Sequence, residues 1–265
     1  MLTRILSTIV LVPLVLLLLL KGEPLHYLLV LIPLSAGLLY EWHGLFKPIA
    51  PLRYILSVAA GVLILLQGYG FAFPLVLIPF GWFFLLFLQE LASGRAVDHD
   101  GLSGMLVHFF GVLYIALPLS MLLMVAQVAQ GSDWIIYIFS ILWSTDSGAY
   151  FVGKAIGKHK FSPRVSPNKT WEGTLGGLFM AALIGTGVAV FLELPMPLWH
   201  AVTLSMIASS FGQIGDLAES YIKRVVKIKD SGNLIPGHGG LLDRLDSLLF
   251  AAPIIYFYTG VILGQ

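Results

Sequence analysis

SGMLVHFFGVLYIALPLSMLLMVA, residues 103–126, contains no aspartate, glutamate, lysine or arginine. A helix needs about 20 apolar residues to cross the hydrocarbon core of a bilayer, so this stretch can span a membrane. Further apolar runs, separated by polar breaks or by breaks rich in glycine and proline, cover most of the chain. The expected spans are 3–20, 26–45, 53–69, 71–90, 103–126, 133–152, 173–192, 198–219 and 246–263. The runs are too long for strands and do not alternate, so we predict an all-α integral membrane protein with about nine transmembrane helices and no strands.

The composition also favours a membrane protein. Of the 265 residues, 58% are hydrophobic and 11% are charged, whereas a soluble domain carries about 25% charged residues. The formal net charge is +1, so the overall charge predicts no partner. Cysteine is absent, which excludes disulfides and thiolate chemistry. A metal would have to be bound by carboxylates, histidines, hydroxyls or phosphates.

The lysines and arginines indicate how the chain is oriented. If the N-terminus is cytoplasmic, the outer segments hold Lys21 alone, and all other cations lie inside, as the positive-inside rule requires. We therefore predict a cytoplasmic N-terminus, with the C-terminus on the opposite side of the cell inner membrane or of another membrane that faces the cytoplasm. Residues 5–20 could also be the apolar core of a signal peptide, but no small-residue cleavage site follows and more spans come after. We divide the chain into four generic spans (1–102) and a catalytic region with two basic cytoplasmic loops (103–265).

Several acids lie within or at the ends of apolar runs. A carboxylate at the centre of a membrane helix costs about 2.5–3.5 kcal/mol, so such residues usually face a polar cavity. Asp146, Asp216 and Glu219 belong to this class, and a basic loop follows soon after each of the two aspartates, so we expect both to line one cytoplasmic cavity. Glu41 and Glu90 are interpreted instead as helix-end charges that reach the membrane surface, so we expect Glu41→Gln to be mild.

Two helical patterns group polar side chains. Asp243 and Asp246 lie three residues apart at the entry to the last span, and Asp216 belongs to the span before it. Their three carboxylates could converge on Mg²⁺, which takes one or two carboxylates plus phosphates and water, and Asp146 is a further candidate. At the end of the eighth span, the spacing i, i+3, i+4, i+7 places four residues on one helix face, namely Asp216, Glu219, Ser220 and Lys223.

The first basic loop contains SPNKTWEG, residues 166–173, directly before an apolar run. A helix start offers free backbone N–H groups and the positive end of the helix dipole, which together favour phosphate. Lys169 and Thr170 would add donors. The alternative is a basic loop that touches anionic lipid head groups, which suits Lys154, Lys158 and Lys160 at least as well.

The second basic loop, residues 220–246, is richer in candidates. Clustered cations can clamp a polyphosphate, and glycines let the backbone approach phosphate oxygens. His238 stands between glycines, where it could donate to a phosphate or act as an acid toward a leaving group, or be a turn histidine without chemistry. Neither loop contains a Walker A motif or a strand-linked glycine fingerprint. The polar candidates are Lys223, Arg224, Lys227, Lys229, Asp230 and Arg244.

The second loop reads SxIKRx4KDxGx2IPxHGGLxDRLD over residues 220–246. This run resembles the signature of the phosphatidate cytidylyltransferases, also called CDP-diacylglycerol synthases, without a departure at any fixed position. SPNKTWEG and the segment from Asp146 to Tyr150 are similar to upstream features of the same family. The resemblance covers roughly the last half of the chain, and nothing is carried over to the first four spans.

The resemblance implies a Mg²⁺-dependent reaction of CTP with phosphatidate that gives CDP-diacylglycerol and pyrophosphate. It assigns the metal to Asp216 and Asp243 and, less directly, to Asp246, and we allow for a second cation. We assign charge neutralisation and catalysis to the basic residues of the second loop together with His238. The candidates for substrate binding are Ser166, Asn168, Lys169, Thr170, Ser220, Arg224, Lys227, Lys229, Asp230, Gly239, Gly240 and Asp146.

Other functions remain to be distinguished from this one. A related enzyme could use another lipid phosphate, such as an archaeal ether lipid. A CDP-alcohol phosphotransferase would need an Asp-Gly-x2-Ala-Arg motif, which is missing. An ion-coupled transporter would usually show internal repeats, and the sequence shows none. We expect CTP, phosphatidate and membrane lipids as partners, expect no nucleic acid, and allow for a homodimer.

Overall fold

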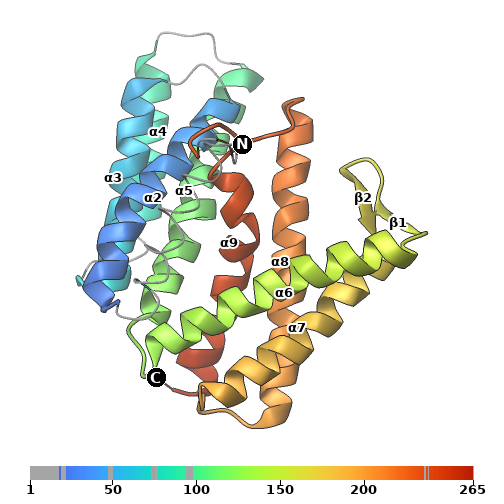
Figure 1. The fold of residues 1–265 in the computed structure, drawn as a ribbon. Coiled ribbons are helices and arrows are strands. Elements are labelled where there is room, and N and C mark those ends of the chain that lie inside the picture. Colours follow the sequence, from blue (N-terminus) through green and yellow to red (C-terminus); the bar gives the residue numbers. More distant parts are fainter. Residues whose placement is uncertain are drawn as a thin grey trace.

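Helices make up almost all of the structure (Figure 1). The computed structural model describes Leu18 and residues 22–46, 50–72, 74, 77–93, 98–235, 237 and 239–264. In chain order the elements are α2 (Pro24–Leu45), α3 (Pro51–Tyr69), α4 (Leu77–Ala92), α5 (His99–Val125), α6 (Gly131–Ile156), β1 (Lys160–Ser162), β2 (Ser166–Thr170), α7 (Trp171–Phe191), α8 (Leu198–Val225), α9 (Leu242–Phe257) and the π-helical turn η1 (Tyr258–Ile262).

The described helices coincide with the expected spans from the second to the ninth. The expected span 3–20 lies outside the described residues, except for Leu18. Six described helices are long and apolar enough to cross a membrane: α2, α3, α5, α6, α7 and α9 together with η1. Helix α4 has only 16 residues, and α8 is less apolar because residues such as Ser205, Ser209 and Gln213 interrupt it. The helical membrane architecture is therefore confirmed, while the count of nine spans and the side of each terminus stay predictions.

Helices α6 and α7 lie very close together because glycines line their contact. A Cβ atom on Gly176 would lie 2.5 Å from the Cβ of Val152, and one on Gly148 would lie 2.6 Å from the Cγ of Met180. Small residues let membrane helices approach in this way. The contact fixes the start of α7, and the segment that precedes it, beside the cytoplasmic end expected for α6.

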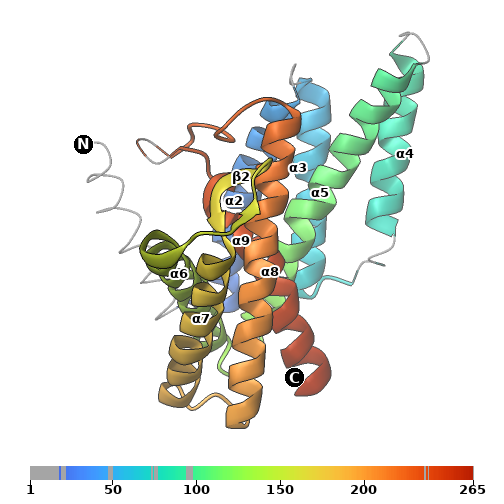
Figure 2. The ribbon, with the colours of Figure 1, turned by 90° about the vertical axis from the view of Figure 1, so that its right-hand side faces the viewer.

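Helix α9 joins the two halves of the bundle. Helices α2 to α5 pack on one another on one side, and α6 to α8 pack on the other. Helix α9 contacts both α5 and α8. Figure 1 shows α9 between them, and in Figure 2 it passes behind α8. The first turn of α9 therefore lies next to the last turns of α8, although a loop of 16 residues (226–241) separates the two helices in the sequence.

A short antiparallel hairpin, β1–β2, follows α6 and projects from the bundle (Figure 1). Lys160 pairs with Thr170 in the register of the hairpin, and Ser162 pairs with Ser166. The prediction that the chain contains no strands is wrong here, because three- and five-residue strands in a polar loop are too short to produce a visible alternation. The second strand leads directly into α7.

An ion pair between Arg53 and Glu90 connects the start of α3 to the last turns of α4. The two side chains are 9% and 19% exposed, respectively. Glu90, near the end of α4, is therefore partnered by Arg53, and the interpretation of Glu90 as a helix-end charge that reaches the membrane surface stays a prediction.

We expect Arg53→Gln to lower the melting temperature of the protein in detergent. Removing one partner of a buried ion pair costs about 3–5 kcal/mol, and the partial exposure of Glu90 places our expectation at the lower end of this range. Thermal unfolding followed by intrinsic fluorescence measures the change. Arg53→Lys, which keeps the charge, is the control and should lose less stability. An Arg53→Gln protein as stable as the unmodified one would show that the pair contributes nothing.

Candidate active site

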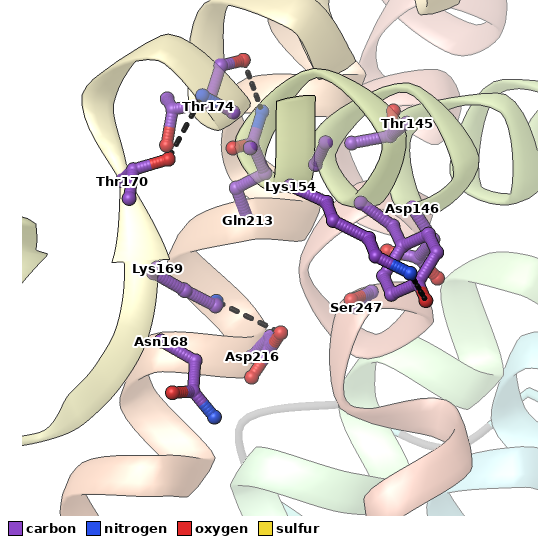
Figure 3. A pocket seen from close by; sticks show the side chains of 14 residues that line it. Thr145, Asp146, Lys154, Asn168, Lys169, Thr170, Thr174, Gln213, Asp216 and Ser247 are labelled. Atoms are coloured by element: carbon purple, nitrogen blue, oxygen red, sulfur yellow. Dashed lines mark hydrogen bonds and ion pairs between the residues drawn. The ribbon is translucent and has the colours of Figure 1, made fainter. Parts of the chain in front are cut away.

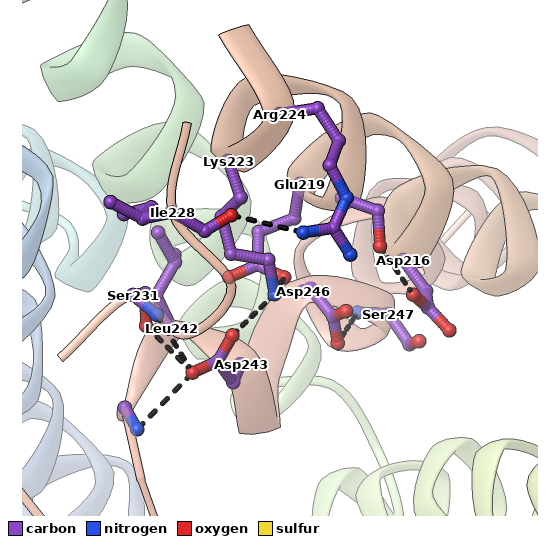
Figure 4. Close-up of polar contacts among 12 residues, drawn as sticks. Asp216, Glu219, Lys223, Arg224, Ile228, Ser231, Leu242, Asp243, Asp246 and Ser247 are labelled. Carbon is purple, nitrogen blue, oxygen red and sulfur yellow. Dashed lines mark hydrogen bonds and ion pairs between the residues drawn. The ribbon is translucent and has the colours of Figure 1, made fainter. Parts of the chain in front are cut away.

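The end of α8 carries a row of polar side chains on one face, as the spacing predicts (Figure 4). The Ser220 hydroxyl donates to Oδ1 of Asp216 over 3.3 Å. One turn further, the Lys223 ammonium lies 2.6 Å from Oε2 of Glu219. Glu219 is 1% exposed and Lys223 is 8% exposed, so the row runs from a half-exposed aspartate into the interior.

Asp243, in the first turn of α9, accepts hydrogen bonds from the loop that precedes this helix. Its Oδ2 accepts from the backbone N–H of Ser231 (2.9 Å), from the Ser231 hydroxyl (3.1 Å) and from the N–H of Gly240 (3.2 Å). Its Oδ1 forms an ion pair with Lys223. One carboxylate thus joins the glycine-rich loop, the start of α9 and the end of α8.

Lys223 is the cation at the centre of this network. It lies in the last turn of α8, beyond the apolar part of the helix, and contacts the carboxylates of both Glu219 and Asp243. Burial alone would lower the pKa of its ammonium group, but the hydrogen bonds to Asp243 and Glu219 outweigh burial and raise the pKa. Lys223 therefore keeps its positive charge at neutral pH.

A cavity of about 460 Å³ opens between the hairpin and helices α6, α7 and α8 (Figure 3). The Lys169 ammonium lies 2.8 Å from Oδ2 of Asp216 at its wall. The Thr170 hydroxyl caps α7 by accepting from the N–H of Gly173 over 3.2 Å, so the expected helix start is confirmed. The polar lining residues are Thr145, Asp146, Tyr150, Lys154, Asn168, Lys169, Thr170, Thr174, Gln213, Asp216 and Ser247.

A second cavity, of about 440 Å³, lies next to the first. The two cavities share Asp146, Asp216 and Ser247 as lining residues, so these three mark the boundary between them. Asp146 and Asp216 therefore line the same cavities, as predicted, while the cytoplasmic position of these cavities stays a prediction. The second cavity is lined by Phe139, Leu142, Trp143, Asp146, Asp216, Glu219, Lys223, Asp243, Arg244, Asp246, Ser247 and Leu248.

The carboxylates at this boundary are the candidate ligands of the expected metal cation. In the described part of the chain, no three histidine, aspartate or glutamate side chains are arranged to hold one metal ion by themselves. Both oxygens of Asp243 face donors, and so do both oxygens of Asp216, which contact Ser220 and Lys169. Asp146 and Asp216 line both cavities. Mg²⁺ often binds through one or two carboxylates plus phosphate oxygens. These residues therefore fit a cation shared with a phosphate ligand, and the metal assignment stays a prediction.

Other predicted residues line neither of the two cavities. Arg224 turns toward the hairpin, where its Nε donates to the carbonyl of Val165 over 3.2 Å. Its Nη1 donates to the carbonyl of Ile228, just after α8, over 3.0 Å. His238 lies outside the described residues. The remaining residues that line neither cavity are Ser166, Ser220, Lys227, Lys229, Asp230, Gly239 and Gly240.

Some lining residues were not predicted. Thr145 and Ser247 each stand next to a predicted aspartate in the sequence, but a hydroxyl beside an acid is too common a pattern to signal a site. Gln213 lies three residues before Asp216, on the same face of α8, and this helical spacing could have pointed to it. Glu219 was expected in a cavity, which is confirmed for the second one.

Among the predicted residues, Glu41 has the environment that differs most from the one we expected. A helix-end charge that reaches the membrane surface should be exposed, yet Glu41 is 3% exposed. Its carboxylate accepts hydrogen bonds from Ser231, Leu234 and Leu242. The interpretation of Glu41 is therefore wrong, because long-range contacts with the glycine-rich loop, which lies about 190 residues further along the chain, cover it.

Known proteins with related sequences match this chain. The model of the cytidylyltransferase family matches residues 2–262. The phosphatidate cytidylyltransferase of Bacillus subtilis (strain 168) is 50% identical over 127 residues, which are 48% of this chain and 47% of that protein. The enzymes of the same name from Staphylococcus aureus (strain COL) and Staphylococcus saprophyticus are 47% and 44% identical over 127 residues, 48% of this chain and 49% of theirs. The chain spans about half the length of the curated relatives it matches.

Proposed function

The chain belongs to the cytidylyltransferase family, and on this premise we propose that it transfers CMP from CTP to phosphatidate and releases pyrophosphate. The product would be CDP-diacylglycerol, the activated lipid of phospholipid synthesis. Relatives that carry the name phosphatidate cytidylyltransferase support this substrate pair. We further propose that the reaction takes place at the cytoplasmic face, where CTP is available and where the basic loops are expected.

The observation that carries the proposal is the pair of adjacent cavities. A transfer between two phosphate compounds requires two anionic ligands side by side with their reacting groups in contact. The cavities meet at Asp146, Asp216 and Ser247, and each contributes cations, with Lys169 in the first and Lys223 and Arg244 in the second. Cations near the two ligands reduce the repulsion between their phosphates, which is the main obstacle to the approach.

We assign the nucleotide to the first cavity and the lipid to the second. The first is bordered by the polar hairpin and by Lys154 at the end of α6. Most of the residues that line the second are charged or polar, but one side of it lies along α6, where Phe139, Leu142 and the 58% exposed Trp143 line it. This apolar side suits the glycerol backbone and acyl chains of a membrane lipid, and Lys154 and Lys169 in the first cavity suit a triphosphate.

The chemistry needs no covalent intermediate on the protein. A phosphate oxygen of phosphatidate attacks the α-phosphorus of CTP, and the bond to the β-phosphate breaks, so that pyrophosphate leaves with the bonding electrons. The attacking phosphate is already ionised at neutral pH and requires no general base. The protein then contributes orientation and charge neutralisation, which dominate phosphoryl transfer.

We propose that Asp216, with Asp146 or Asp243 beside it, holds Mg²⁺ together with substrate phosphates. A bound Mg²⁺ supplies positive charge that offsets the charge developing on the phosphate oxygens. Lys169 must then release Asp216, with which it pairs at 2.8 Å, and bind a phosphate in its place. The ion pair keeps both side chains oriented toward the boundary before substrate arrives.

Two variants should separate the cavities. We expect Lys169→Met to raise KM for CTP by about tenfold to a hundredfold, because a charged hydrogen bond contributes roughly 1.5–3 kcal/mol. We expect Trp143→Ala to raise KM for phosphatidate by about tenfold through lost apolar contact. Steady-state kinetics with each substrate varied in turn measures both. The opposite pattern, with each variant affecting the other substrate, would reverse the assignment of the cavities.

The test of the function is turnover by the purified protein in detergent. CTP, short-chain phosphatidate and Mg²⁺ are supplied, and pyrophosphate and CDP-diacylglycerol are both measured. We expect product only when CTP and phosphatidate are both present, with strong dependence on Mg²⁺. Product with another lipid phosphate but not with phosphatidate would identify a different cytidylyltransferase. Folded protein that turns over no lipid phosphate would overturn the proposal.

A further inference from the structure

We propose that Glu41, on α2, is a positioning residue that holds the segment 231–242 and thereby orients Asp243 in the active site. The proposal rests on the proposed function as far as turnover is concerned. The proposal gives a residue of the N-terminal helices a role in the site, although the signature of residues 220–246 contains no residue of these helices.

The contacts of Glu41 with this segment are numerous and direct. Its Oε2 accepts from the backbone N–H of Leu242 over 2.8 Å and from the Ser231 hydroxyl over 3.1 Å. Its Oε1 accepts from the N–H of Leu234 over 3.4 Å. The carboxylate thus binds the beginning, the middle and the end of the segment. A carboxylate that is 3% exposed needs such donors, because burying it without partners would be very costly.

Glu41 also completes the start of α9. The first N–H groups of a helix have no partner within the helix. The N-cap residue of α9 is Leu241, whose own side chain has no acceptor and makes no cap hydrogen bond. The Glu41 carboxylate accepts from Leu242, the first residue of α9, and brings a negative charge to the positive end of the helix dipole. A residue of α2 therefore acts as the cap of α9.

The Ser231 hydroxyl carries the effect of Glu41 to the active site. It lies 3.1 Å from Oε2 of Glu41 and 3.1 Å from Oδ2 of Asp243, so the two carboxylates share its single proton. The backbone N–H of Ser231 also donates to Asp243, and Asp243 pairs with Lys223. A shift of Ser231 would therefore move Asp243, and with it the ammonium group of Lys223.

Gly232 leaves just enough room for this arrangement. A Cβ atom at position 232 would lie 2.7 Å from Cδ and 2.9 Å from Cγ of Glu41. Real side chains do not approach so closely, and the Glu41 carboxylate has little freedom to move because three donors hold it. The contact therefore provides a second, independent way to disturb the position of Glu41.

The experiment combines turnover with an observable that does not need turnover. We expect Glu41→Gln to lower kcat by about tenfold to a hundredfold, the effect of losing a charged hydrogen bond, and to leave both KM values within about threefold. An amide cannot accept from all three donors, because its nitrogen faces at least one N–H or O–H group. Hydrogen exchange of the ligand-free protein should become faster in residues 231–242 and stay unchanged in α6 and α7. The control is Glu23→Gln, the same change at an exposed position before the first turn of α2, which should alter neither observable.

A double-mutant cycle tests the contact itself. We expect Gly232→Ala to lower kcat by about tenfold or more in the unmodified protein and to add little to Glu41→Ala, because the clash is then gone. If Glu41→Gln keeps full kcat and unchanged hydrogen exchange, the proposal is wrong. It is also wrong if Glu41→Gln lowers the melting temperature while the protein that remains folded keeps its kcat. If the unmodified protein turns over no lipid phosphate, the proposed function fails by itself, and the exchange measurement still decides whether Glu41 holds the segment.

Discussion

Asp216→Asn is expected to reduce kcat by at least about a thousandfold while the protein stays folded. Asp216 lines both cavities, and its carboxylate lies where the phosphates of the two substrates would meet. Loss of its charge removes the proposed anchor for Mg²⁺, and a metal ion contributes several kcal/mol to stabilising the charge of a transition state. The side chain is 37% exposed, so an amide of the same shape should cost little stability.

Single-turnover measurement of CDP-diacylglycerol formation, together with the melting temperature, checks this expectation. Asp100→Asn provides the matched control, because Asp100 is an exposed carboxylate in the first turn of α5 and lines neither cavity. We expect the control to retain full turnover. If Asp216→Asn keeps more than a tenth of the activity, the proposed role of Asp216 in binding the cation is wrong.

The helices and the row of polar residues on α8 could be predicted because each depends on local spacing. An apolar run of about 20 residues has few stable states other than a membrane helix. Residues three and four apart share a face of any α-helix, so Ser220 had to lie near Asp216, and Lys223 near Glu219. The high cost of a carboxylate in an apolar run likewise pointed to Asp146 and Asp216, which the structure brings together.

Contacts between distant segments could not be predicted in the same way. Nothing in the residues around Glu41 distinguishes it from a helix-end charge, because its partners lie in the segment 231–242. Lys169 was expected to bind an anion and Asp216 a cation, and their direct ion pair depends on the close packing of α6, α7 and α8. Arg224 was expected to neutralise phosphate, yet it reaches the hairpin at Val165, whose position is also a result of tertiary packing.

Asp243→Ala is expected to abolish turnover and also to loosen the loop before α9. The sequence alone suggests that this variant loses chemistry and keeps its structure, since an acid in a cavity contributes little to packing. The structure adds a second effect, because Asp243 accepts from Ser231 and Gly240 and forms an ion pair with Lys223. Removing the carboxylate leaves Lys223 with Glu219 as its remaining described carboxylate partner. The cation then moves toward Glu219 and away from the place where a phosphate would bind.

Comparing Asp243→Ala with Asp243→Asn separates the two effects of this carboxylate. The asparagine oxygen can still accept from the Ser231 and Gly240 N–H groups, but its amide nitrogen then faces the Lys223 ammonium, and two donors repel. We therefore expect Asp243→Asn to keep most of the hydrogen-exchange protection of residues 231–242 and to lose at least about a hundredfold in kcat. Asp243→Ala should lose both. If both variants lose hydrogen-exchange protection to the same extent and kcat falls equally in both, Asp243 acts only by holding the loop. Retained turnover in Asp243→Asn would show that the charge of this residue is not required.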